Sequence, residues 1–148
     1  MVHYDLCEIH NMVLRAEVTA TYLHTGQRDK AGQPYIKHPE AVSEMMDTDE
    51  EKAVAWLHDV VEDSNWTIYD LKIVGFPESV LEAVGLLTHG ENVPYGEYIT
   101  NIKNNPLARK VKIADLKHNL DLTRLTMVTE KDIERCRKYL DALQVLIS

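Results

Sequence analysis

Apolar residues recur at helical spacing along most of the chain. Between residues 4 and 24 they stand three or four positions apart, at Leu6, Ile9, Val13, Ala16, Ala20 and Leu23. This spacing predicts a helix over residues 4–24. A polar, glycine-containing loop follows at residues 26–34. We expect a second helix to open at His38, because Pro39 suits a first helical turn.

The rest of the chain continues the helical pattern. A third helix is expected over residues 49–63, with an acidic start that complements its dipole. Thr67 with Asp70, and Thr129 with Asp132, match capping boxes at helix starts. Further helices are expected over residues 77–88, 95–104, 106–122 and 130–147. Strand patterns are weak throughout, so we expect residues 1–148 to form one all-α domain.

The charge balance narrows the possible partners. Sixteen basic and twenty-four acidic residues give a net charge of −8, which argues against a general nucleic-acid surface. An anionic substrate would need a local cationic device, either a metal ion or clustered basic side chains. No run approaches the roughly 18 apolar residues of a membrane helix, and the N-terminus lacks a signal-peptide pattern. We therefore expect a cytoplasmic protein without a membrane partner, and buried free thiols at Cys7 and Cys136.

The stretch WLHDVVED places four ionisable side chains in an apolar helix. His58 with Glu62, and Asp59 with Asp63, are pairs one turn apart and would share one sector. Burying three carboxylates is costly without a cation, and Lys52 is the only basic residue in the predicted helix. A divalent metal ion accounts for the pattern better than salt bridges, because imidazole and carboxylate are its ordinary ligands.

Two other stretches add candidate groups. GQPYIKHP sets His38 at a helix start after a rigid turn. VKIADLKHNL places Asp115 in the middle of an apolar helix, with Asn119 one turn further on the same face.

Together the ordered motifs HTGQ, GQPYIKHP, WLHDVVED and KIADLKHN resemble those of the HD superfamily of metal-dependent phosphohydrolases. They are most similar to the hydrolase domain of the Rel/SpoT enzymes and the stand-alone small alarmone hydrolases. The resemblance runs from about His24 to Leu125. It implies a single-domain, HD-type helical bundle.

The resemblance also implies roles for individual residues. One divalent ion, usually manganese in this family, would be held by His38, His58, Asp59 and Asp115. Glu62 and Asp63 match the catalytic acidic pair that handles the attacking water. The nucleotide substrate would meet Arg28, Lys30, Tyr35 and Asn119.

Two positions depart from the family pattern. Asp29 interrupts the basic loop between Arg28 and Lys30, and Leu116–Lys117 reverses the usual order of a basic residue and a leucine. A shift of one residue turns a helical side chain by about 100°, so Lys117 does not simply replace the missing base. Both departures concern substrate contacts and leave the expected metal ligands intact.

The motifs favour a metal-dependent nucleotide phosphohydrolase, and specifically a guanosine 3′,5′-bis(diphosphate) (ppGpp) 3′-pyrophosphohydrolase. The alternatives are another nucleotide phosphohydrolase, acting on monophosphates or an adenine alarmone, and an HD module that binds metal or nucleotide without turnover. A purely structural helical domain fits the intact motif set less well. Among the remaining polar residues, His24 is expected to pack at a helix end. We expect a structural or solvated role for His118, and a solvated helix face for the basic group Arg109, Lys110 and Lys112.

Overall fold

The computed structural model describes residues 2–148, and this part of the chain is helical without a strand. Its only sheet-like pairing is an isolated bridge between Arg28 and Pro34. The helices are α1 (Val2–Cys7), α2 (Met12–Leu23), α3 (Lys37–Glu44), α4 (Asp49–Leu57), α5 (Val60–Asp63), α6 (Ile68–Val74), α7 (Glu78–Leu87), α8 (Tyr95–Lys103), α9 (Pro106–Asn119) and α10 (Glu130–Ile147), with a 3₁₀ turn at Leu122–Arg124. The expected all-α class is confirmed.

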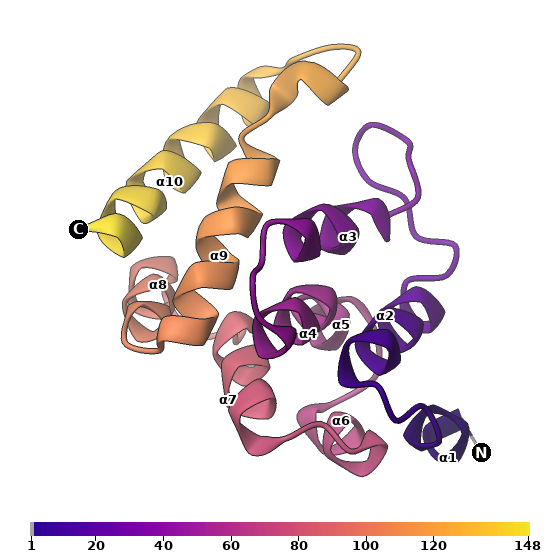
Figure 1. The fold of residues 1–148 in the computed structure, drawn as a ribbon. Coiled ribbons are helices and arrows are strands. Elements are labelled where there is room, and N and C mark those ends of the chain that lie inside the picture. The colour runs from indigo at the N-terminus through magenta and orange to yellow at the C-terminus, as the bar shows by residue number, and fades with distance from the viewer. Residues whose placement is uncertain (1) are drawn as a thin grey trace.

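Helix α4 lies at the centre of the bundle and contacts α2, α3, α7 and α9 (Figure 1). Its last five residues, Ala53–Leu57, are all buried, as expected of a helix covered on every side. A capping box between Thr48 and Glu51 starts the helix, and its first turn is acidic as predicted. The WLHDVVED motif therefore begins inside the core.

Three predicted helices differ from the observed ones. The helix expected over 4–24 breaks before Asn11, whose side chain accepts the N–H of Leu14 and caps α2. The helix expected over 49–63 breaks at His58 and Asp59, which separate α4 from α5. The helix expected over 106–122 ends at Asn119. Apolar periodicity continues across all three places, so it hides the local breaks.

Helix α10 closes one side of the bundle by packing on α8 and α9 (Figure 1). The predicted capping box of Thr129 and Asp132 starts it, and that of Thr67 and Asp70 starts α6. Neither cysteine is disulfide-bonded, but the prediction of burial was wrong. Cys7 is exposed and Cys136 half-buried, because each lies at a helix surface. Within residues 2–148, no helix has both the length and the apolar character needed to cross a bilayer.

Candidate metal centre

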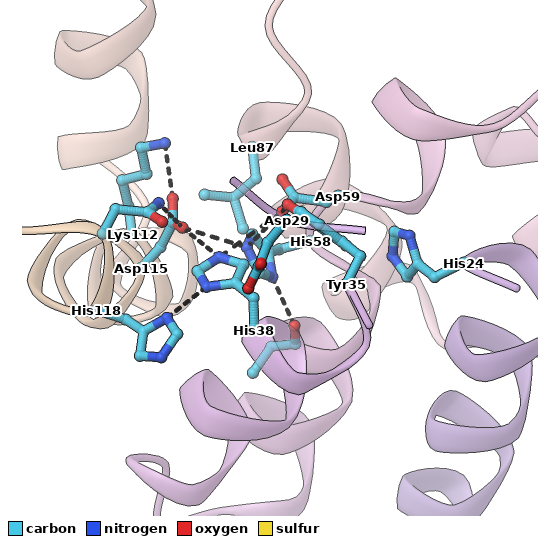
Figure 2. A network of polar contacts seen from close by, with 12 residues as sticks. His24, Asp29, Tyr35, His38, His58, Asp59, Leu87, Lys112, Asp115 and His118 are labelled. Carbon is cyan, nitrogen blue, oxygen red and sulfur yellow. Dashed lines mark hydrogen bonds and ion pairs between the residues drawn. The ribbon is translucent and has the colours of Figure 1, made fainter. Parts of the chain in front are cut away.

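Four side chains from three distant segments converge beside α4: His38 from α3, His58 and Asp59 from the α4–α5 junction, and Asp115 from α9. Figure 2 shows them pointing toward one another. One ligand atom of each lies within 4.8 Å of the others. Nε2 of His38 is 2.8 Å from Oδ1 of Asp115. Nε2 of His58 is 3.0 Å from Oδ2 of Asp59.

The break between α4 and α5 brings neighbouring residues to one point. In a continuous helix, His58 and Asp59 would diverge by about 100°. Asp59 instead has φ −109° and ψ −2°, outside ideal helical geometry, and its carboxylate turns toward the ring of His58. Asp63 still donates its N–H to the carbonyl of Asp59 at 3.0 Å, so the chain re-enters a helix at once.

The protonation pattern of His58 fits a metal ligand. Its Nδ1 lies 2.6 Å from the carbonyl oxygen of Ala55 and must donate there, because a carbonyl only accepts. Nε2 of His58 is buried without a hydrogen-bond partner, although carboxylates of Asp59 and Asp115 lie nearby. Two imidazole nitrogens and two carboxylate oxygens form a donor set suited to a divalent metal ion.

The electrostatic environment keeps the two carboxylates of the cluster negatively charged. Burial disfavours charge on His58, yet Asp59 and Asp115 raise its pKa well above the usual value. Burial likewise opposes ionisation of Asp59, but His58 lowers its pKa to about 2. In Asp115, Lys112 and His38 overcome burial and hold the pKa well below the usual range. The carboxylates are therefore ionised and available to a cation.

Asp115 is held on both sides by its own helix. Nζ of Lys112 lies 2.9 Å from Oδ2, and Nδ2 of Asn119 donates to Oδ1 at 3.0 Å. Lys112 also lies over the ring of Tyr98, 5.3 Å from its centroid. The prediction of a solvated basic face was therefore wrong for Lys112, whose side chain is only 13% exposed. Lys110 is different, since it pairs with Asp47 and Glu51 at the start of α4.

Tyr35 and His24 support the cluster from the opposite side. The hydroxyl of Tyr35 donates to Oδ2 of Asp59 at 2.5 Å. His24 is buried as expected, and its Nδ1 lies 2.7 Å from Oε1 of Gln27. Gln27 in turn donates to the carbonyl of Asp63 at 2.8 Å. The HTGQ motif thus ties the loop after α2 to the end of α5.

The acidic pair Glu62 and Asp63 lies at the rim of the cluster. Oε1 of Glu62 accepts the backbone N–H of His89, which fixes its direction. Burial raises the pKa of Glu62, and the nearby Asp59 adds to the effect. Burial, Asp59 and Glu62 raise the pKa of Asp63 to about 6. A carboxyl group with such a pKa can exchange a proton near neutral pH.

A cavity of about 360 Å³ adjoins the cluster. Tyr35 and Asn119 line it and also contact the candidate ligands Asp59 and Asp115. Its charged lining residues are Arg28, Lys30, Arg124 and Arg135 against Asp29 and Asp121. Positive charge is therefore in excess here, although the protein is acidic overall.

The two departures from the family pattern have structural explanations. Oδ1 of Asp29 accepts the N–H groups of Ala31 and Gln33, both at 2.9 Å, so it orders the loop. Leu116 is fully buried in the core, and Lys117 is exposed. Lys117 therefore does not line the cavity.

Helix α10 and the turn before it contribute cavity residues that the sequence analysis missed. Arg124 lies in the 3₁₀ turn, and Arg135 and Tyr139 lie on α10. Nη2 of Arg135 donates to Oδ1 of Asp132, which holds the arginine in place. Arg124 and Arg135 belong to no motif that links them to the cluster, so their positive charge alone did not mark them as cavity residues.

No protein-family model matches the chain. Among curated proteins, the guanosine-3′,5′-bis(diphosphate) 3′-pyrophosphohydrolase MESH1 of Danio rerio is 34% identical over 134 residues, covering 81% of this chain and 74% of that protein. A probable guanosine-3′,5′-bis(diphosphate) 3′-pyrophosphohydrolase of Synechocystis is 34% identical over 125 residues. A GTP pyrophosphokinase of Streptomyces coelicolor is 31% identical over 140 residues. The chain spans 16% of the length of each of the last two relatives, and they cover 75% and 86% of it, respectively.

A solved structure supports the fold independently. It is described as a metazoan ortholog of SpoT that hydrolyzes ppGpp, and it superposes with a TM-score of 0.74 at 24% identity, covering 89% of this chain and 85% of the other. The helical bundle and its histidine–aspartate cluster define a domain of the HD superfamily. Within that class, the chain belongs to the Rel/SpoT-like hydrolase family that includes MESH1.

Proposed function

We propose that this chain is a metal-dependent ppGpp 3′-pyrophosphohydrolase. The observation that carries the proposal is the contact between the cluster and the basic cavity, made through Tyr35 and Asn119. A substrate whose phosphates occupy the cavity would lie beside the four candidate ligands, His38, His58, Asp59 and Asp115. The names of the MESH1 and Synechocystis relatives support ppGpp as the substrate.

The proposed division of labour follows the chemistry of the residues. A bound divalent ion, which we propose to be manganese, supplies charge neutralisation at a phosphoryl oxygen and lowers the pKa of water. Glu62 and Asp63 orient the attacking water and accept its proton. Asp63 is the better-matched base of the two at neutral pH, given its pKa of about 6. Attack of this water at the 3′ phosphorus breaks the bond to the ribose 3′ oxygen, which takes up the proton that the acidic pair accepted, and pyrophosphate is released as one unit.

The cavity residues bind and position the nucleotide in this proposal. Arg28 and Lys30 from the loop, with Arg124 and Arg135, neutralise the phosphates. Tyr35 and Asn119 have a second task, since each also holds a candidate ligand. The hydroxyl of Tyr35 already donates to Asp59, so Tyr35 contacts the substrate through its ring.

A product assay tests the proposal. The purified chain is incubated with ppGpp, an adenine analogue or nucleoside monophosphates, in Mn²⁺ or in EDTA. We expect Mn²⁺-dependent release of pyrophosphate, not orthophosphate, from ppGpp, and loss of this activity in Asp63→Asn. Orthophosphate release from monophosphates would indicate another phosphohydrolase. Bound Mn²⁺ without turnover of any compound would indicate a binding module.

A further inference from the structure

His118 lies behind His38, on the side facing away from the cluster. Nδ1 of His118 is 2.7 Å from Nδ1 of His38, and the two ring planes are inclined by 30° with centroids 4.9 Å apart. The other ring nitrogen of His38, Nε2, faces Asp115. No nitrogen of His118 belongs to the group of candidate ligand atoms. Figure 2 shows the ring of His118 joined to that of His38 by this contact.

Two nitrogens at this distance share a single hydrogen, so one must donate and the other must accept. If Nε2 of His38 binds a metal ion, it needs a free lone pair, and the hydrogen of the neutral ring is then on Nδ1. Nδ1 of His38 consequently donates, and Nδ1 of His118 accepts. The remaining hydrogen of His118 lies on its own Nε2.

We propose that His118 is a positioning residue of the metal centre, which accepts the Nδ1–H of His38 and so fixes the Nε2 lone pair of His38 toward the metal. The inference rests on the metal centre proposed above. It gives His118 a specific task in place of the structural or solvated role expected from the sequence.

The second histidine ligand is oriented by a different acceptor. Nδ1 of His58 donates to the backbone carbonyl of Ala55, which side-chain substitution leaves in place. His38 depends on a side chain, so its orientation is open to mutation. A neutral imidazole acceptor also adds no negative charge beside Asp59 and Asp115, unlike the carboxylate that often supports a ligating histidine.

A matched pair of variants tests the proposal through metal affinity, without substrate. In His118→Asn, Oδ1 occupies nearly the place of Nδ1 and still accepts, whereas the similarly shaped side chain of His118→Leu cannot. We expect the dissociation constant for Mn²⁺, measured by titration calorimetry, to rise about 10-fold or more in His118→Leu. His118→Asn should recover most of the lost affinity. Lys117→Leu, at an exposed neighbouring position, is the control and should bind as the wild type does.

Unchanged affinity in His118→Leu, or equal losses in both variants, would overturn this role of His118. A wild-type protein that binds no divalent ion would refute the metal centre itself, so the two failures are distinguishable. A second test uses only the wild-type protein, so it does not depend on whether a variant folds. Long-range ¹H–¹⁵N NMR of the Zn²⁺-loaded protein reports which ring nitrogen of each histidine carries hydrogen. It should show hydrogen on Nδ1 of His38 and on Nε2 of His118. Hydrogen on Nδ1 of His118 would contradict the proposal.

Discussion

Lys112 and Asp115 form an ion pair inside the protein, one turn apart on α9, with 2.9 Å between Nζ and Oδ2. The other oxygen of the same carboxylate faces His38 at 2.8 Å. The two oxygens of Asp115 therefore have different partners. Lys112 keeps the carboxylate ionised and in place while Oδ1 remains directed at the cluster.

Removing this lysine should destabilise the metal-free protein. Lys112→Met leaves Asp115 with only histidine and asparagine partners, so we expect the free energy of unfolding to fall by about 1–3 kcal/mol, less than for a fully unpaired buried charge. Urea denaturation in EDTA measures the loss. The exposed Lys117→Met on the same helix is the control, and its effect should stay within about 0.5 kcal/mol. Equal losses in the two variants would contradict a structural role for the ion pair.

Loss of one candidate ligand should abolish metal binding while leaving the fold intact. Asp59→Ala removes a carboxylate from the cluster, so bound Mn²⁺ should fall from about one ion per chain to almost none. The rise in melting temperature on adding Mn²⁺ should disappear with it. Metal analysis and thermal melts followed by circular dichroism measure both effects. Asp5→Ala in α1 should retain the ion, and tight binding by Asp59→Ala would remove Asp59 from the ligand set.

Asp63 should make the stability of the metal-free protein depend on pH. Its pKa is raised from 3.8 to about 6 in the folded protein, so the folded state holds the proton more tightly than the unfolded state. Stability from this group is present below about pH 4 and is lost as the pH rises through 6. Asp63→Asn should therefore stabilise the protein above pH 6, by only about 0.5–1 kcal/mol because solvent reaches the rim. Below pH 4 the variant should gain nothing.

Urea unfolding in EDTA at pH 4 and pH 7.5 compares the two proteins. Asp141→Asn, on the exposed surface of α10, is the matched control and should show no such pH-dependent gain. A gain for Asp63→Asn that is the same at both pH values would contradict the raised pKa.

Restoring the family's basic residue at position 29 should impair the loop. Asp29→Lys loses two hydrogen bonds to the backbone, each worth about 1 kcal/mol. We expect faster proteolysis between Gly26 and Pro34 and a higher KM for the substrate, despite the added positive charge. Asp29→Asn keeps the accepting oxygen and should retain the loop. Tighter substrate binding by Asp29→Lys would show that charge outweighs loop order here.

Features that depend on local sequence pattern, and residues that belong to the recognised motifs, could be predicted from the sequence. The capping boxes at Thr67 and Thr129 are local signals, and the structure has both. The break at Asp59 was not predictable from periodicity, because apolar positions continue across it. The sequence places Lys112 in a short basic run that is typical of an exposed helix face. Its burial beside Tyr98 follows from the packing of α9, which the run does not indicate. His118 stands one turn after Asp115, which could bring it toward the site, but its contact with His38 was not predictable because His38 lies 80 residues away in the chain.

The wide separation of the candidate ligands along the chain has a consequence for unfolding. His38 and Asp115 are 77 residues apart, so an ion held by both closes a long loop, as a covalent cross-link would. Because the ligands meet only in the folded chain, unfolding must release the ion, so a bound ion opposes the opening of this loop. Metal supply would then set how long the protein survives proteolysis, independently of its catalytic turnover. Chelation should shorten its lifetime even where no substrate is present.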